Sequence, residues 1–519
     1  MPAPMADPGT LNLPALVAAL ALTVLPGCGP AARPAPVPDE ALRPLGTNAQ
    51  GYAEYRRAKD GMPMVRIPAG AYPRRPYARS STTGVPERVD VPGYLIDKLE
   101  VSNAQFARFL AESGADAKAS RPLLREQPWG LRRAGAGWEP QPGYEEHPAV
   151  GVTGWGALAY ARWAGARLPS PDAWMKAAGG SEGLEYPFGS WREDACNWRG
   201  LALRSTQPVT AFPASASPVG CLNMAGNVYE RVFAQRDGQQ IPVMIKGGSW
   251  VTAHPLNLRV LDLCMQGMDA SEQSVGFRCM VWEADLAGPL AAVSGPAPAL
   301  PPPPVLKRLA APPALLLARG FGAGVAEAQE RNCVLLLSLH LDTCGQCDRT
   351  REQILTDPAL VRHLNEACVT VVGQDPGDAG QHPHRPLADG GCPLHPGLSC
   401  AAHQEIFRQA LTVVRSFVVS PGTFILTPHA APGAGPEDWI LVGERDLPKN
   451  GEGAAILLEK LKQAQAKLGP CLTRGEYGGI QAAMDAVVQR KAGAREDLSR
   501  LLEGKDPRIP LVSEALALP

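Results

Sequence analysis

The sequence has almost no net charge. Its 50 Lys and Arg residues are matched by 51 Asp and Glu residues, which gives a formal net charge of −1. A nucleic-acid partner usually requires a basic face, and an interaction tail usually appears as a block of like charges. The sequence has neither feature, so we expect no nucleic-acid partner. With 519 residues, of which 45% are hydrophobic, the chain is long enough for two or more domains with separate cores.

The amino terminus lacks an apolar run long enough to span a bilayer as an ordinary helix, because its longest covers only residues 13–25. Gly27 and Cys28 follow. This pattern resembles a bacterial lipobox, which implies a signal peptide over residues 1–28 and a lipid on Cys28. We therefore expect a lipid-anchored protein of the bacterial cell envelope, facing the periplasm or the exterior. No Lys or Arg precedes Arg33, however, where such a signal is usually positive. The alternative is a disordered, Ala/Pro-rich start.

Composition divides the rest of the chain. Residues 29–60 are Pro/Ala-rich and then helix-like, which predicts a tether. Residues 286–312 are Pro-rich and predict an extended linker. Between them, residues 61–285 have many turns and few periodic runs, which predicts a loop-rich α+β domain. Residues 313–470 contain long apolar runs typical of an α/β domain, and residues 471–519 have apolar residues at helical spacing, which predicts a helical tail.

Residues 61–285 contain short motifs in a characteristic order. They resemble the formylglycine-generating enzyme (sulfatase-modifying factor) family, which implies a C-type-lectin-like fold. The main motifs are "MVRIPAGAY" (64–72), "YLIDKLEVSNAQFARFL" (94–110), the stretch 147–178, "NMAGNVYE" (223–230), "KGGSW" (246–250) and "GFRC" (276–279). Within the central stretch, Ser170 before Pro171 and Asp172 predicts a helix N-cap with Pro at the first helical position.

One motif could hold an ion. The side chains of Asn223 and Glu230 and the carbonyl groups of Gly226 and Val228 are hard oxygen ligands, which suit calcium. The resemblance implies the same four positions as a structural calcium site. The alternative is a capped turn that binds no ion.

The resemblance also allows a test of catalysis. Members that oxidise a substrate cysteine to formylglycine hold copper between two cysteines after the Gly-Gly-Ser-aromatic turn, and Cu(I) requires soft thiolates. That spacing falls on Thr252 and Asn257 in this sequence. Neither side chain supplies a thiolate, so we expect no copper and predict a domain that binds rather than catalyses.

A C-x-x-C motif forms the second candidate site. Cys344 and Cys347 follow an apolar run of strand length, residues 333–341, and a helical pattern and a second apolar run, residues 368–375, come next. This order predicts a βαβ unit with a redox dithiol. It resembles the thioredoxin-like superfamily, in which a cis-proline faces the dithiol. Pro421 is our candidate for this cis-proline.

The roles of the two cysteines follow from their predicted place at a helix N-terminus. The helix dipole there favours the thiolate of Cys344, which makes it the predicted nucleophile. Cys347 is then the resolving thiol. The alternative is a static disulfide on an inert fold. A carboxyl-terminal helix of this domain is predicted over residues 453–468.

A third candidate site lies in an insertion, since Cys347 and Pro421 are 74 positions apart. The insertion contains a C-x2-H-x4-C-x2-H pattern formed by Cys392, His395, Cys400 and His403. Four nitrogen and sulfur ligands suit zinc or a copper ion. In an exported protein a Cys392–Cys400 disulfide explains the cysteines more simply, and we favour it. A relay of electrons between these cysteines and Cys344 is a further alternative.

These features together predict a cell-envelope lipoprotein with two modules. One is a non-catalytic, sulfatase-modifying-factor-like binding domain, and the other is a thioredoxin-like thiol–disulfide oxidoreductase that acts on disulfides of exported proteins. The main alternative is a non-enzymatic binding or scaffold protein of the envelope. A sulfatase-modifying enzyme that uses relocated cysteines is the weakest alternative.

Overall fold

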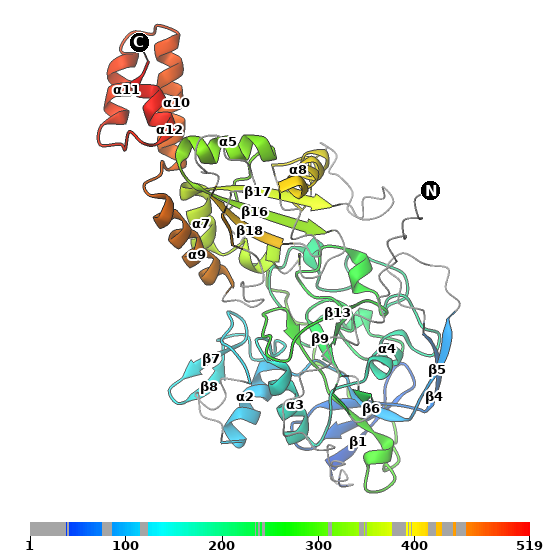
Figure 1. Cartoon of the computed structure of the whole chain (residues 1–519). Helices are drawn as coiled ribbons and strands as arrows, with labels where there is room; N and C mark the ends of the chain where they lie inside the picture. The colour runs from blue at the N-terminus through cyan, green and yellow to red at the C-terminus, as the bar shows by residue number, and fades with distance from the viewer. Residues whose placement is uncertain are drawn as a thin grey trace, which may run out of the picture.

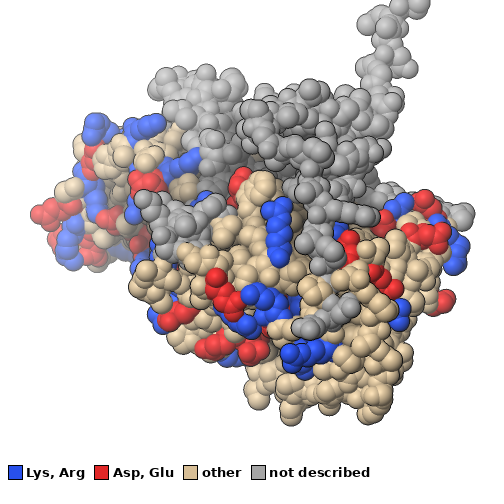
Figure 2. Space-filling view, turned by 90° about the horizontal axis from the view of Figure 1, so that it is seen from below, with Lys and Arg blue, Asp and Glu red and all other residues tan. Residues whose placement is uncertain are grey.

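The computed structural model has two folded bodies joined by an extended segment, and a group of helices at the carboxyl end (Figure 1). Basic and acidic side chains are interspersed on the described surface in Figure 2. The candidate residues Cys28, Cys344 and Pro421 lie outside the described residues. The structure describes residues 38, 41–74, 86–114, 123–233, 235–236, 239–240, 244–309, 314–341, 347, 350–375, 391–392, 394–395, 397–413, 422–427, 440–442 and 453–518.

The first body is built on a five-stranded antiparallel sheet. Its strands lie in the order β1 (Leu42–Thr47), β2 (Ala53–Arg57), β3 (Pro63–Ile67), β6 (Tyr94–Asp97) and β15 (Met280–Trp282). Two of these strands fall within the predicted tether, residues 29–60, so that prediction is wrong for residues 41–60.

The physical reason is a buried ion pair that the sequence pattern does not reveal. The Arg57 guanidinium lies 2.6 Å from an Asp60 carboxylate oxygen and 2.8 Å from one of Asp97, and all three side chains are buried. A charged segment that looks solvent-exposed in the sequence is therefore part of the interior.

Helices cover both faces of this sheet. On one face, α2 (Asn103–Glu112) and α3 (Gly154–Trp163) pack against Met64 and Leu95. On the other, α4 (Pro171–Gly179) packs against the next residues along the same strands, among them Val65 and Ile96. The predicted cap of α4 is confirmed, because Ser170 Oγ accepts a hydrogen bond from the Ala173 backbone at 3.1 Å.

The rest of the first body consists of short strands and turns, as predicted for a loop-rich α+β domain. A second sheet has the order β13 (Leu263–Met265), β12 (Met244–Lys246), β9 (Tyr229–Val232) and β14 (Val275–Gly276), with β14 and β9 parallel. The two-stranded hairpins are β4 (Gly70–Arg74) with β5 (Glu87–Val91), β7 (Leu131–Ala134) with β8 (Gly137–Pro140), and β10 (Gln235–Arg236) with β11 (Gln239–Gln240). The 3-10 turns are Arg199–Leu201, Pro213–Ser215, Pro255–Leu258 and Glu283–Asp285.

The described part of the predicted linker, residues 286–309, runs along the first body rather than projecting as a free spacer. Thr47 donates to Gly295 O at 2.9 Å and accepts from Ala297 N at 2.8 Å. The side chain of Gln207 accepts from Lys307 N and donates to Lys307 O, both at 2.8 Å. The segment has no regular helix or strand after Asp285, as its composition predicts, but it is docked.

At Leu309, the last described residue of this segment, the backbone donates to Leu203 O at 3.0 Å. At Ala314, where the described chain resumes, the carbonyl accepts from Asn365 Nδ2 of the second body at 2.9 Å. Leu316 N donates to Oδ1 of the same Asn365 at 2.8 Å. Both ends of the short intervening segment are therefore anchored, one on each body.

The second body is built on a four-stranded mixed sheet. Its order is β17 (Cys368–Asp375), β16 (Val334–Leu341), β18 (Gly422–Thr427) and β19 (Ile440–Val442). β16 and β17 are parallel, whereas β18 is antiparallel to both β16 and β19. The two predicted apolar strands are confirmed.

Helices cover both faces of this sheet too. The helices α5 (Phe321–Arg331) and α8 (Cys400–Val413) pack on the side of Leu335 and Val369, while α7 (Pro358–Ala367) and α9 (Gly453–Leu468) pack on the side of Leu336. The predicted helix over residues 453–468 is confirmed with the same bounds. A short π-helical turn, Thr350–Ile354, precedes α7.

The predicted helical tail is confirmed. It consists of α10 (Arg474–Val488), α11 (Ala494–Leu502) and α12 (Pro510–Leu516), which share a core that includes Ile480 and Leu498. In the part of the chain that the structure describes, no helix combines the length and hydrophobicity needed to cross a membrane.

Candidate functional site

The sheet of the second body brings the two cysteine-containing segments to one edge. Because β16 and β17 are parallel, their carboxyl ends meet at the same edge. Cys347 follows β16 and is 2% exposed. Cys392 comes after β17. Cys344 and Pro421, the predicted nucleophile and cis-proline, lie outside the described residues.

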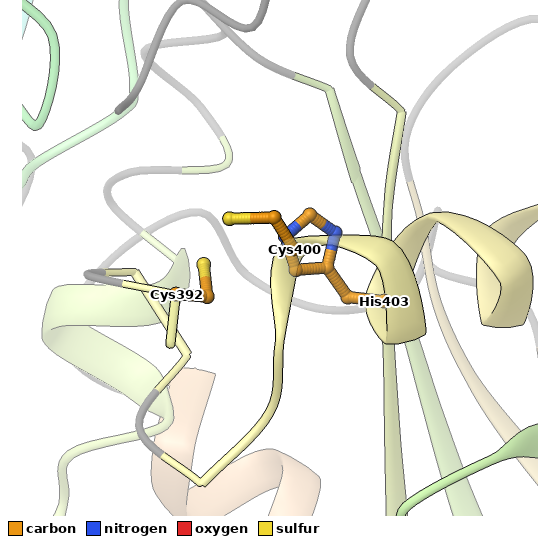
Figure 3. Close-up of side chains that lie close together, drawn as sticks. All are labelled: Cys392, Cys400 and His403. Carbon is orange, nitrogen blue, oxygen red and sulfur yellow. The ribbon is translucent and has the colours of Figure 1, made fainter. Parts of the chain in front are cut away.

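Three of the four residues of the predicted C-x2-H-x4-C-x2-H site come together. The ligand atoms of Cys392, Cys400 and His403 all lie within 4.8 Å of one another, and all three side chains are buried. Cys392 belongs to a loop, whereas Cys400 and His403 come from the first turn of α8 (Figure 3). Both cysteines are thiols in the structure, so the disulfide that we favoured from the sequence is not formed there.

Local backbone contacts create this arrangement. The Cys392 N–H donates to Leu398 O at 2.8 Å, which places the loop beside the start of α8. Ser399 caps that helix, since its Oγ accepts from Ala402 N at 3.1 Å. Cys400 and His403 are three residues apart and therefore share one face of the helix.

A glycine allows α8 to lie close to the sheet. A Cβ atom at Gly373 of β17 would stand 2.8 Å from Phe407 Cα of α8, closer than real side chains approach backbone. The helix can thus pack closely against the end of β17 at Phe407.

The fourth predicted ligand, His395, lies beside the cluster but is engaged elsewhere. Its Nε2 donates to Gln374 Oε1 at 2.9 Å, and its ring centre is 5.6 Å from that of His403 and 5.8 Å from that of His340. Burial, together with the nearby Arg351 charge, holds the pKa of His395 and of His340 well below the ordinary value. Both rings are therefore neutral near pH 7. His340 also lies beside this cluster, but the C-x2-H-x4-C-x2-H pattern could not reveal it, because His340 belongs to β16, far earlier in the sequence.

In the first body, the positions at which the resemblance implies copper cysteines are buried. Thr252 Oγ1 accepts from Ser249 N at 2.9 Å and lies 3.3 Å from the Tyr229 hydroxyl. Asn257 is 4% exposed and lies in the 3-10 turn Pro255–Leu258. Thr252 supplies a hydroxyl group and Asn257 an amide. Neither is a soft donor, so these two side chains do not fit Cu(I).

Of the four predicted calcium ligands, Glu230 is already paired in the structure. Its Oε1 lies 2.6 Å from Arg278 Nη2, and its Oε2 accepts from Arg278 Nε and Trp174 Nε1, each at 2.6 Å. A guanidinium at these oxygens opposes a dication there. Calcium at Asn223, Gly226, Val228 and Glu230 thus stays a prediction, and the ion would have to compete with Arg278.

A buried carboxyl group that sequence reasoning missed lies next to this pair. Glu100 is fully buried and accepts hydrogen bonds from the side-chain amides of Asn223 and Asn227, at 3.0 and 2.9 Å. Burial and the nearby negative charge of Glu230 raise the pKa of Glu100 to about 8. Its position three residues after the end of the apolar strand β6 was the available signal, but its partners are more than 120 residues away in sequence.

Comparison with known proteins identifies the first body. Residues 50–283 match the sulfatase-modifying factor enzyme 1-like domain. The formylglycine-generating enzyme of Thermomonospora curvata is 32% identical over 281 residues, which cover 42% of this chain and 92% of that enzyme. The chain belongs to this family.

Other relatives match less than half of this chain. A protein named serine/threonine-protein kinase Pkn1 from Chlamydia trachomatis is 39% identical over 144 residues, 27% of this chain. The chain spans between 23% and 37% of the length of three Pkn1 relatives. A solved structure of PvdO from Pseudomonas aeruginosa is 23% identical, covers 44% of this chain and 97% of its own, and has a TM-score of 0.36.

Proposed function

We propose that the protein is a lipid-anchored thiol–disulfide oxidoreductase of the bacterial cell envelope. In this proposal the second body is a thioredoxin-like domain, and the sulfatase-modifying factor domain binds the protein's substrates or partners without copper chemistry. Exported proteins that carry disulfides are the proposed substrates, and a lipid on Cys28 is the proposed membrane anchor.

The observation that carries the proposal is the location of the C-x-x-C motif on its sheet. Cys347 follows the central strand β16 at the edge where β16 and β17 both end. The sheet order β17-β16-β18-β19, with one parallel and two antiparallel pairings, supports a thioredoxin-like arrangement. Burial of Cys347 suits a resolving thiol, which reacts only after the nucleophile has formed the mixed disulfide.

The chemistry transfers two electrons from the dithiol to the substrate. The Cys344 thiolate attacks one sulfur of the substrate disulfide, forms a mixed disulfide and releases the other substrate sulfur as a thiolate. Cys347 then attacks the Cys344 sulfur, which forms the Cys344–Cys347 disulfide and releases the second substrate thiol. A dithiol reductant restores the starting state.

For the first body, Thr252 and Asn257 support binding rather than formylglycine formation. A hydroxyl and an amide cannot replace two copper thiolates. The remaining alternative is a non-enzymatic scaffold. The following experiment distinguishes this alternative from the proposed oxidoreductase.

We expect the purified protein to accelerate the reduction of insulin disulfides by dithiothreitol, and we expect Cys344→Ser to return the rate to that of dithiothreitol alone, because the variant lacks the nucleophile. Cys347→Ser should lower the rate, and, when it is reduced first and mixed with insulin after removal of the dithiothreitol, it should accumulate a mixed disulfide that is detectable by mass, because no resolving thiol remains. Cys471→Ser is the matched control and should keep the wild-type rate. Equal rates with and without the protein, across a range of redox buffers, would support the scaffold instead.

A further inference from the structure

We propose that Cys392, Cys400 and His403 form a binding site for a single thiophilic d10 cation, Zn²⁺ or Cu⁺. The site is separate from the Cys344–Cys347 dithiol and does not depend on the oxidoreductase activity proposed above. It uses two thiolates and one imidazole, the donor types that both ions prefer.

The geometry of the donors suits one small ion. With a metal–sulfur distance of about 2.3 Å and a metal–nitrogen distance of about 2.0 Å, the ligand atoms of a tetrahedral site lie roughly 3.5–4 Å apart. The three donor atoms here lie within 4.8 Å of one another. Small rotations of the side chains are enough to close the site, because the backbone already brings the loop and the helix together (Figure 3).

Two other uses of these residues explain less of the structure. A Cys392–Cys400 disulfide would engage both sulfur atoms but would give the His403 imidazole no part, although that ring is fully buried at the same point. A reactive thiol activated by His403 would need access for a substrate. Cys392 and Cys400 are only 1% and 5% exposed. A metal ion uses all three donors and requires no large opening.

The burial of the site favours thiolate ligands in particular, because an uncompensated charge in the interior is costly. Two thiolates cancel the charge of Zn²⁺ completely and outweigh that of Cu⁺, so the loaded site buries no net positive charge.

Surrounding groups also hold the His403 ring in place. The His395 ring packs edge-on against it and is itself fixed by its hydrogen bond to Gln374. Outer residues that orient a ligand in this way are typical of metal sites. Three protein ligands leave a fourth coordination position for water or an exogenous ligand, as in zinc sites that remain open.

The test starts from the whole protein, reduced and stripped of metal with a chelator under anaerobic conditions. After addition of Zn²⁺ alone, or Cu⁺ alone, and removal of the unbound ion, we expect one bound ion per chain by elemental mass spectrometry. Binding should release protons, since the thiols lose theirs, and should raise the melting temperature of the protein. With equal amounts of both ions, the retained ion identifies which of the two the site prefers.

Single substitutions then locate the ion. Cys392→Ser, Cys400→Ser and His403→Gln should each weaken binding by more than about 100-fold, beyond the usual cost of losing an outer partner. Cys471→Ser and Cys344→Ser should bind as the wild type does. Cobalt substitution gives an independent signal, because a thiolate-to-cobalt charge-transfer band should be present in the wild type and altered in both cysteine variants.

Three results would overturn the proposal. The first is no uptake of either ion by protein in which alkylation after unfolding shows that both thiols were reduced. The second is full uptake of the ion by Cys392→Ser. Cys392 lies in a loop, so we expect this substitution to disturb folding less than substitutions in α8 would. The third is loss of the ion in Cys344→Ser with retention in Cys392→Ser, which would assign the ion to the C-x-x-C motif.

Discussion

Arg278→Leu is expected to lower the free energy of unfolding of the sulfatase-modifying factor domain by about 3–5 kcal/mol. Arg278 and Glu230 are 0% and 1% exposed, and their closest approach is 2.6 Å. Removal of the guanidinium leaves a carboxylate in the interior, where Trp174 Nε1 still donates to one of its oxygens at 2.6 Å. Arg278 also donates to the carbonyl groups of Asp97 and Leu222, at 2.9 and 2.7 Å, which the leucine would leave without this donor.

Urea unfolding followed by tryptophan fluorescence measures this loss in the right part of the protein, because nine of the ten tryptophans precede residue 283. The matched control is Arg108→Leu, which breaks a surface pair with Glu112 and should cost less than about 1 kcal/mol. The double variant Arg278→Leu/Glu230→Leu should recover part of the loss, since it removes the unpaired charge as well. A loss below about 1 kcal/mol in Arg278→Leu would contradict the structural importance of the pair.

Glu100→Gln is expected to make the same domain more stable at pH 8 and to reduce the dependence of its stability on pH. The pKa of Glu100 is raised from 4.5 to about 8 in the folded protein. Between these values the folded state holds a proton that the unfolded state has lost. Wild-type stability therefore falls as the pH rises through this window, by up to about 1.4 kcal/mol per pH unit from this group. Glutamine has the shape of the protonated carboxyl group and does not titrate.

The measurement is the urea midpoint at a series of pH values for wild type and variant. Some pH dependence will remain in Glu100→Gln, because burial also raises the pKa of Asp97, to about 6. Glu182→Gln, at an exposed position, is the control and should follow the wild-type curve. Parallel curves for wild type and Glu100→Gln would mean that Glu100 is ionised in the folded domain.

The elements that the sequence predicted well are those whose own residues determine them. The apolar runs of β16 and β17 and the periodic pattern of α9 each contain enough information to define a strand or a helix. The C-x2-H-x4-C-x2-H spacing likewise predicted that Cys392, Cys400 and His403 would meet, because a short loop and one helical turn connect them.

The predictions that failed depended on partners far away in the chain. Arg57 belongs to the interior only because Asp97, forty residues later, pairs with it. The pairing of Glu230 with Arg278, 48 residues later, was missed for the same reason, and calcium at this site stays a prediction. The proline-rich linker is extended as predicted, but its docking depends on Thr47 and Gln207, which no local pattern connects with it.

The docked linker has a consequence for how the two bodies could act on one molecule. Leu309 is held on the first body and Ala314 on the second, and the five Cα–Cα steps between them reach at most about 18 Å. A free linker of the predicted length would let the second body search a large volume. In the function proposed above, a partner held by the sulfatase-modifying factor domain would therefore meet the second body at a high effective concentration, provided that the partner is large enough to contact both bodies.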